Sequence, residues 1–204
     1  MSRILRVLRH AVVYEVKLYR ALLRWVTRRP DVPVGATAFT YVKAVAVLLW
    51  AFVIVSAIEV VALELILPWE TVRLIALVLG LWGLVWMLGL TASYHVYPHL
   101  VDAEGIRVRD GVARDIRIPW DAVGSLRSRE RSRESSKAVQ LDEAEGASVL
   151  HLVTSSRTNV DVVLSRPLAV PVKGRTVEVV EIRFFADEPR ALVTHVRERS
   201  AATG

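Results

Sequence analysis

The sequence predicts a membrane α-helical hairpin, preceded by an amphipathic helix and followed by a small all-β or α+β barrel with a C-terminal helix. Three observations predict this fold class: a basic amphipathic pattern over residues 3–29, two long apolar runs, and an alternating pattern with a period of two beyond Tyr94. We therefore divide the chain into an amphipathic interfacial helix 1–30, a linker 31–40, a hairpin 41–93 with spans at about 41–67 and 72–92, a β-rich domain 94–200 and a tail 201–204.

The helical periodicity of residues 3–29 places the basic side chains within an arc of about 120°, with apolar side chains opposite them. Charged residues interrupt this segment too often for a membrane span. We therefore expect the helix to lie along the membrane surface, with its arginines among lipid phosphates. The predicted membrane-surface residues are Arg3, Arg6, Arg9, Lys17, Arg20, Arg24, Arg28 and Arg29.

The charge of the chain is concentrated at its N-terminus. Residues 1–30 carry eight Arg or Lys residues against Glu15 alone, whereas the chain from Pro98 onward carries seventeen basic and sixteen acidic residues. A basic segment beside apolar helices indicates anionic lipid headgroups as a partner. The nearly neutral C-terminal half gives no electrostatic sign of nucleic-acid binding. Cysteine is absent, which excludes disulfides and thiolate metal sites.

The two apolar runs each reach the roughly 20 residues needed to cross a bilayer, and only a short Leu-Pro-Trp-Glu-Thr segment separates them. Two spans leave both long flanks on one side, and the strongly basic flank places that side in the cytoplasm. The strong preference for arginine over lysine is a hint of a GC-rich bacterial genome. We therefore expect a multi-pass protein of a bacterial plasma membrane with cytoplasmic N- and C-termini.

Among the charged residues of the predicted hairpin, the candidates for intramembrane polar groups are Glu59, Glu64 and Arg73. In the first interpretation they lie near the outer interface, with Glu64 and Arg73 at similar depth. In the second, the carboxylates mark an ion or proton path, which requires that the hairpins oligomerise. We favour the first interpretation because two helices alone enclose no channel.

Glu15 departs from the amphipathic pattern because it lies near the middle of the apolar arc. A carboxylate pointed into acyl chains costs several kcal/mol unless it is neutralised or paired. We therefore predict that this face of the helix packs on protein, with Glu15 as the candidate interface residue. The alternatives for that protein are a second copy of the chain, the hairpin, or a partner subunit. A kink or a shallow position of the helix is the simpler structural explanation.

A β-hairpin is predicted around Asp110-Gly111. A two-residue loop would turn the isoleucines of the second strand to the wrong face, so we predict a three-residue loop with Gly111 in the left-handed conformation. Pro119 is expected to end the second strand, and Trp120 to plug the barrel. The predicted core face of this hairpin contains Ile106, Val108, Val112, Ile116 and Ile118.

The rest of the β-rich domain is predicted to contain further strands and one helix. Residues 127–147 are polar with mixed charge, and we expect a solvated loop there. Asp187-Glu188-Pro189 is typical of a helix start, with an N-cap followed by an early proline. The expected elements are strands at 148–154, 158–164, 168–172 and 176–185 and a helix at 190–199.

No constellation for catalysis stands out. The sequence contains no metal motif of the His-Glu-x-x-His type and no Gly-x-Ser-x-Gly elbow. We expect the histidines at positions 10, 95, 99, 151 and 195 to be surface or juxtamembrane residues. The prediction is a non-enzyme without catalytic residues, metal or cofactor.

Short motifs along residues 94–200 give a family resemblance. They are Gly105-Ile-Arg-Val-Arg109, the turn glycine Gly111, Ile118-Pro119-Trp120 and Asp187-Glu188-Pro189. In this order they resemble the bacterial PH-like (pleckstrin-homology-like) domain, here attached to a two-helix transmembrane hairpin. The resemblance implies an adaptor for a protein or membrane surface. We do not extend it to a lipid-headgroup specificity, because acids offset the arginines of the hairpin.

Taken together, the sequence predicts a non-catalytic integral membrane protein that presents a cytoplasmic PH-like domain as an adaptor, scaffold or accessory subunit. The expected partners are the lipid bilayer with its anionic headgroups and a second copy or another membrane protein. The alternative is a small oligomeric membrane regulator or transport component that uses Glu59 and Glu64.

Overall fold

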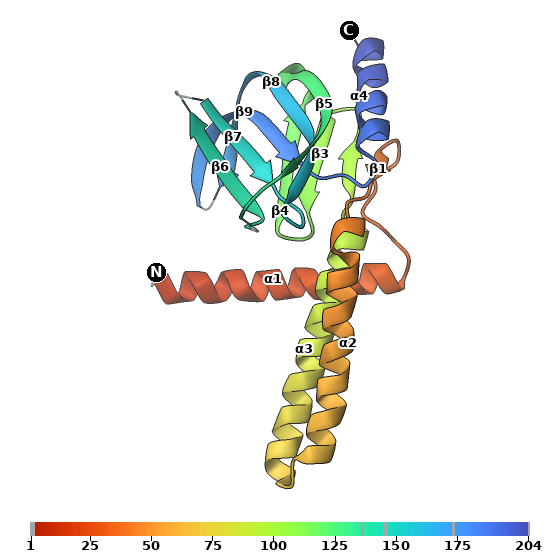
Figure 1. Cartoon of the computed structure of the whole chain (residues 1–204), viewed down its shortest axis with the longest axis vertical. Coiled ribbons are helices and arrows are strands. Elements are labelled where there is room, and N and C mark those ends of the chain that lie inside the picture. Colours follow the sequence, from red (N-terminus) through yellow and green to blue (C-terminus); the bar gives the residue numbers. More distant parts are fainter. Residues whose placement is uncertain (1–2, 136, 145–146, 173, 204) are drawn as a thin grey trace. The chain divides into compact units, whose positions relative to one another are not determined.

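The computed structural model describes residues 3–135, 137–144, 147–172 and 174–203 (Figure 1). The chain folds into two units, which we call the helical unit and the β unit and describe separately. The helical unit contains residues 1–31, 45–97 and 111–113, and the β unit contains residues 32–44, 98–110 and 114–204.

Three helices make up most of the helical unit: α1 (Arg3–Val26), α2 (Lys43–Ile66) and α3 (Glu70–Val96). Helix α1 crosses the α2–α3 pair and contacts α3 (Figure 1). The crossing depends on Gly89, because a Cβ atom at that position would lie only 3.2 Å from both the Cβ and the backbone oxygen of Leu18. Glycine thus lets the two backbones approach closely.

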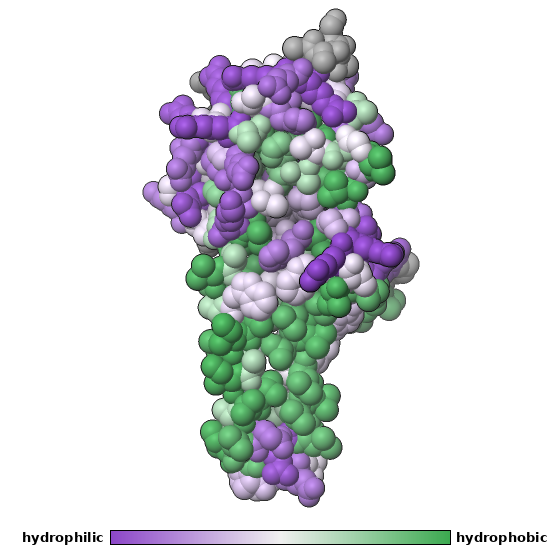
Figure 2. Space-filling view, turned by 90° about the vertical axis from the view of Figure 1, so that its right-hand side faces the viewer, coloured by the Kyte–Doolittle hydropathy of each residue, from purple (hydrophilic) through white to green (hydrophobic). Residues whose placement is uncertain are grey.

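Helices α2 and α3 are long and apolar enough to span a membrane. Their 24 and 27 residues correspond to about 36 and 40 Å of helix, against a hydrocarbon core of about 30 Å. Figure 2 shows a continuous hydrophobic surface along this pair, with polar atoms gathered at the turn that joins the two helices. The prediction of two long apolar helices before a β-rich region is confirmed.

The β unit contains two sheets and a C-terminal helix. The first sheet has the order β1-β2-β3-β4, and the second has the order β5-β8-β9-β7-β6. Neighbouring strands are antiparallel except β7 and β9, which are parallel. The elements are β1 (Thr37–Phe39), β2 (His99–Val101), β3 (Gly105–Asp110), β4 (Arg114–Pro119), the short helix η1 (Trp120–Ala122), β5 (Val123–Ser132), β6 (Val139–Ala144), β7 (Ala147–Leu152), β8 (Arg157–Val172), β9 (Arg175–Phe184) and α4 (Pro189–Thr203).

Alternate residues of the strands form one hydrophobic core, as the period of two requires. Ile118 of the first sheet and Leu150 and Ile182 of the second are fully buried in it. Leu192 brings α4 onto the same core and is also fully buried.

The β3–β4 hairpin has the predicted register. Ile106 pairs with Ile118 and Val108 with Ile116, and three residues connect Asp110 to its partner Arg114. Gly111 has a φ of 51°, the left-handed conformation that we predicted for the first loop position. The buried face fixed this register, since a slip of one residue would expose it.

Several expected boundaries were wrong. The expected linker 31–40 contains strand β1. A strand of three residues whose partner lies far along the chain has too few residues to show a sequence pattern. The expected strands 158–164 and 168–172 are one strand, β8, with an irregularity between Val163 and Leu168. The expected loop 127–147 is largely strand, because its mixed charges pair across strands instead of being solvated.

The segment Asp187-Glu188-Pro189 leads into α4 as expected, and Asp187 has a further role in the β unit. Its carboxylate accepts the backbone N–H of Lys43 at 3.1 Å, and its own N–H donates to the carbonyl of Thr40. Asp187 therefore ties the segment 37–43 to the β unit, and α4 begins with Pro189.

Candidate functional site

Glu15 lies against α3, one of the three alternatives that the sequence left open. Nε1 of Trp82 donates to Oε1 of Glu15 at 2.8 Å and also lies 2.8 Å from the hydroxyl of Tyr19. The Tyr19 hydroxyl donates to the same carboxylate oxygen at 2.5 Å. These hydrogen bonds, first from Tyr19 and then from Trp82, hold the pKa of Glu15 below its ordinary value. Glu15 is thus a paired carboxylate in the contact between α1 and the hairpin.

The predicted basic residues of α1 point mostly away from the helical pair. Arg24 is half-buried, and the side chains of Arg3 and Arg6 lie outside the described residues. The exposed basic side chains are Arg9, Lys17, Arg20, Arg28 and Arg29.

A hollow of about 530 Å³ lies at the C-terminal end of α1. Its aromatic wall is Trp25, whose ring centroid is 5.5 Å from that of His95 and 6.2 Å from that of Trp50. The hollow is lined by Arg24, Trp25, Val26, Arg28, Arg29, Pro30, His95 and Val96. It therefore combines guanidinium groups with an apolar wall.

The three charged residues of the predicted spans do not form one cluster. Glu64 pairs with Arg73 at 3.4 Å, at the end of the hairpin where the helices are joined. Glu59 is exposed at the edge of a hollow of about 390 Å³ between α2 and α3, to which Gly80 and Gly83 also contribute. Among the described residues, no hydrogen bond or ion pair of Glu59 is present.

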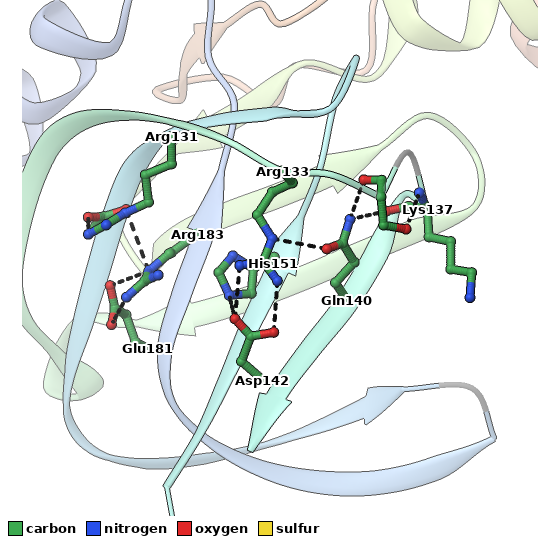
Figure 3. A network of polar contacts seen from close by, with 10 residues as sticks. Arg131, Arg133, Lys137, Gln140, Asp142, His151, Glu181 and Arg183 are labelled. Atoms are coloured by element: carbon green, nitrogen blue, oxygen red, sulfur yellow. Dashed lines mark hydrogen bonds and ion pairs between the residues drawn. The ribbon is translucent and has the colours of Figure 1, made fainter. Parts of the chain in front are cut away.

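The second sheet of the β unit carries a charged network on one face (Figure 3). Arg131 donates to Asp161 at 2.9 Å, and Arg183 lies 3.7 Å from the other oxygen of the same carboxylate. Arg183 also binds Glu181 through two hydrogen bonds of 2.7 and 2.9 Å, and hydrogen bonding to Glu181 raises the pKa of the guanidinium. Asp161 is almost completely buried, so these partners are needed to stabilise its charge.

The other half of the network is centred on Asp142 of β6 (Figure 3). Arg133 donates to both carboxylate oxygens at 2.9 and 2.8 Å, which lowers the pKa of Asp142, and its Nε donates to Gln140 at 3.0 Å. Nε2 of the fully buried His151 lies 3.0 Å from Asp142. Burial, together with the charge of Arg133, lowers the pKa of His151, so the ring is neutral at pH 7.

His99 is a second buried histidine and links three strands of the β unit. Its ring stacks on Tyr41 at 4.4 Å and meets Phe184 edge-on at 4.9 Å. Nδ1 accepts the backbone N–H of Arg109 at 3.0 Å, which leaves Nε2 to donate to the carbonyl of Phe185 at 2.9 Å. Burial lowers the pKa of His99 to about 4. The histidines were expected at the surface or beside the membrane: His99 follows α3 by three residues but is buried, and the expectation was wrong for the fully buried His151.

The residues predicted to shape the β3–β4 hairpin are at its ends: Gly111 is in the loop, and Pro119 and Trp120 are at the end of β4. Trp120 follows Pro119 directly, is partly buried against the core, and donates from Nε1 to the carbonyl of Asp102 at 3.2 Å. The arginines of this hairpin pair with neighbouring acids: Arg107 and Arg109 with Asp115, Arg114 with Asp110, and Arg117 with Glu104.

The charged network around Asp161 and Asp142 and the two partners of Glu15 were not predicted from the sequence. The alternation of arginine with serine or glutamate over residues 127–133 has a period of two, and this signal predicts a strand with one charged face. Tyr19 is four residues after Glu15 and was identifiable as its helical neighbour. Gly89 was identifiable from the sequence as a small residue that permits close helix packing, but its partner was not, and Trp82 gave no sequence signal, because both roles depend on where α1 crosses α3.

Two sheets around one core with a C-terminal helix define a small β domain of the pleckstrin-homology type. Residues 100–192 match the family model described as Bacterial PH domain. The chain thus carries a bacterial PH domain at 100–192, preceded by two long apolar helices. Comparisons of the chain with curated proteins and with solved structures found no match.

Proposed function

We propose that this chain is a non-catalytic bacterial membrane protein that presents its PH domain at the cytoplasmic face as an adaptor, scaffold or accessory subunit. The observation that carries the proposal is the combination, in one chain, of a bacterial PH domain with two helices long enough to span a membrane. The basic helix α1 orients that pair, because an excess of Arg and Lys marks the cytoplasmic side.

The depth at which α1 crosses α3 supports an interfacial position. Gly89 is seventeen residues beyond Val72, which is about 26 Å along the helix. With Val72 at the outer limit of a hydrocarbon core of about 30 Å, α1 lies close to the inner limit. An amphipathic helix at that depth buries its apolar face and keeps its guanidinium groups among the headgroups. Trp25 and Trp50 lie where aromatic residues gather at a membrane boundary.

The surface of the PH domain supports a protein partner over a lipid headgroup. The arginines of the charged network and of the β3–β4 hairpin are paired with carboxylates of the same domain. Strand β6 is at the edge of its sheet, with β7 as its one neighbour among the described strands. Such an edge offers backbone hydrogen bonds to an added strand of a partner.

Photo-crosslinking of the full chain in native membranes tests the proposal. We would place a crosslinkable residue at the exposed positions Glu143 on β6 and Ser128 on β5, with Glu70 at the turn of the hairpin as a control. An adaptor predicts that a defined protein is captured from a PH-domain position and not from Glu70. Capture from neither PH-domain position, or equal capture from all three, would contradict the proposal.

A second candidate function rests on Glu59, the carboxylate exposed at the hollow between α2 and α3. A regulator or transport component that oligomerises would use such a group to bind or relay a cation. Ion flux in proteoliposomes that is abolished by Glu59→Gln and retained by Glu64→Gln would favour this candidate. Flux that is absent, or that Glu59→Gln leaves unchanged, would reject it.

A further inference from the structure

We propose that the hollow at the C-terminal end of α1 is a binding site for the phosphate headgroup of an anionic phospholipid. This inference rests on the proposed membrane position of α1 and adds a specific site to it. A basic helix is attracted to a charged membrane surface without any specific site. A specific site at the hollow and a general attraction of the whole helix therefore predict different effects of substituting individual arginines.

The end of α1 is closed by a Schellman motif, the hydrogen-bonded turn that terminates many helices. The N–H of Arg29 donates to the carbonyl of Arg24 at 2.8 Å, and the N–H of Arg28 donates to the carbonyl of Trp25 at 3.0 Å. The hydroxyl of Thr27 donates to the carbonyl of Leu23 at 2.8 Å. The carbonyls of Leu23, Arg24 and Trp25 therefore have donors, and the positive charge that an anion would meet at this helix end comes from the arginine side chains.

Arg28 stands at the position of this motif where glycine is normally found. Its φ is 54°, in the left-handed region that residues with a Cβ atom adopt at a cost in energy. Glycine would close the helix with less strain, so the cap itself does not explain the arginine. Strain of this kind is often found at functional positions. Here it places a guanidinium group at the hollow.

The arginines at the hollow have different partners. Arg24 is held by Asp31 at 2.9 Å and by the carbonyl of Arg29 at 3.2 Å, so it shapes the wall. The side chains of Arg28 and Arg29 are exposed at the rim. Two adjacent guanidinium groups bind a phosphate through charge-assisted hydrogen bonds, which are among the strongest in proteins.

The apolar part of the lining favours a lipid as the source of the phosphate. Trp25, Val26 and Val96 line the hollow together with the arginines. They suit the glycerol and upper acyl region of a phospholipid, as aromatic and aliphatic residues do at a membrane boundary. A freely soluble phosphate would gain nothing from this wall.

The test is lipid retention by the full chain, extracted from vesicles of equimolar phosphatidylglycerol and phosphatidylcholine and measured by native mass spectrometry. The variant is Arg28→Gly with Arg29→Gln, and the control is Arg9→Gln with Arg20→Gln. Both change the net charge by the same amount, but the control residues lie outside the hollow. Because Arg28→Gly relieves the left-handed strain, this variant keeps the helix cap.

The wild type is expected to retain phosphatidylglycerol preferentially. The Arg28/Arg29 variant should lose about tenfold in that preference, while the control, which weakens only the general attraction of α1 to anionic headgroups, should lose no more than about threefold. An equal loss in both variants, or no preference in the wild type, would overturn the site. Flotation of the chain with the vesicles is scored separately: failure to float overturns the proposed function and the site with it, whereas flotation without preference overturns the site alone.

Discussion

Acidification from about pH 7 to about pH 4.5 is expected to destabilise the β unit through the neutral ring of His99. The pKa of this buried histidine is lowered from 6.5 to about 4 in the folded chain. Between these two values the unfolded chain binds a proton that the folded chain does not. Stability is therefore constant above the unfolded pKa and falls as the pH drops from 6.5 towards 4.

The size of the effect follows from the shift in pKa. Each unit corresponds to about 1.4 kcal/mol, so the full shift is worth about 3 kcal/mol, of which about 2.5 kcal/mol is lost by pH 4.5. This loss is a large part of the free energy of unfolding of a typical domain, which is roughly 5–15 kcal/mol. The cause is physical: an imidazolium ring between Tyr41 and Phe184 would lose its hydration and face the positive charge of Arg109.

Hydrogen exchange of the full chain in detergent measures this loss. The reporters are the amides of β2 and β3, after correction for the pH dependence of intrinsic exchange. His99→Gln keeps a donor for the carbonyl of Phe185 but cannot titrate. The difference between the wild type and this variant in the slope of stability against pH is therefore the contribution of His99, separate from those of His151 and the carboxylates. Equal slopes for wild type and His99→Gln, or greater wild-type stability at the lower pH, would refute the reasoning.

Two further predictions concern packing. Gly89→Val should detach α1 from α3, because even its Cβ atom would lie 3.2 Å from Leu18. A Cβ atom at Gly83 meets nothing within 4 Å, so Gly83→Val should leave the contact intact. Protease sensitivity of α1 distinguishes the two variants, and equal sensitivity would contradict the crossing. Ile182→Ala removes a fully buried side chain and should lower the free energy of unfolding of the β unit by about 2–5 kcal/mol in urea titrations, whereas a loss below about 1 kcal/mol would show that Ile182 is not central to the core.

The sequence patterns predicted the elements whose stability is determined locally or by burial. The apolar runs became α2 and α3, and the period of two around Gly111 led to the correct register because only one register buries both isoleucines of β4. The amphipathic pattern of α1 identified Glu15 as a residue that needs a partner. These inferences use only hydrophobic periodicity and the cost of an unpaired charge.

Elements that depend on distant partners were not predicted. Strand β1 exists because it pairs with β2, some sixty residues further along the chain, and three residues carry too little pattern of their own. His151 is buried by strands that sequence reasoning assigned to a loop. The hollow at Arg28 depends on a left-handed arginine, which no propensity rule predicts, since glycine is the residue expected there.

The central claim, a PH domain held at the cytoplasmic face by a two-helix hairpin, is tested most directly by cysteine labelling. The chain contains no cysteine, so single substitutions report without background. Thr71→Cys is at the turn of the hairpin, and Ser128→Cys is on an exposed position of the PH domain. In right-side-out spheroplasts, a membrane-impermeant maleimide should label Thr71→Cys at once and Ser128→Cys only after permeabilisation. Labelling of Ser128→Cys in intact spheroplasts would contradict the account.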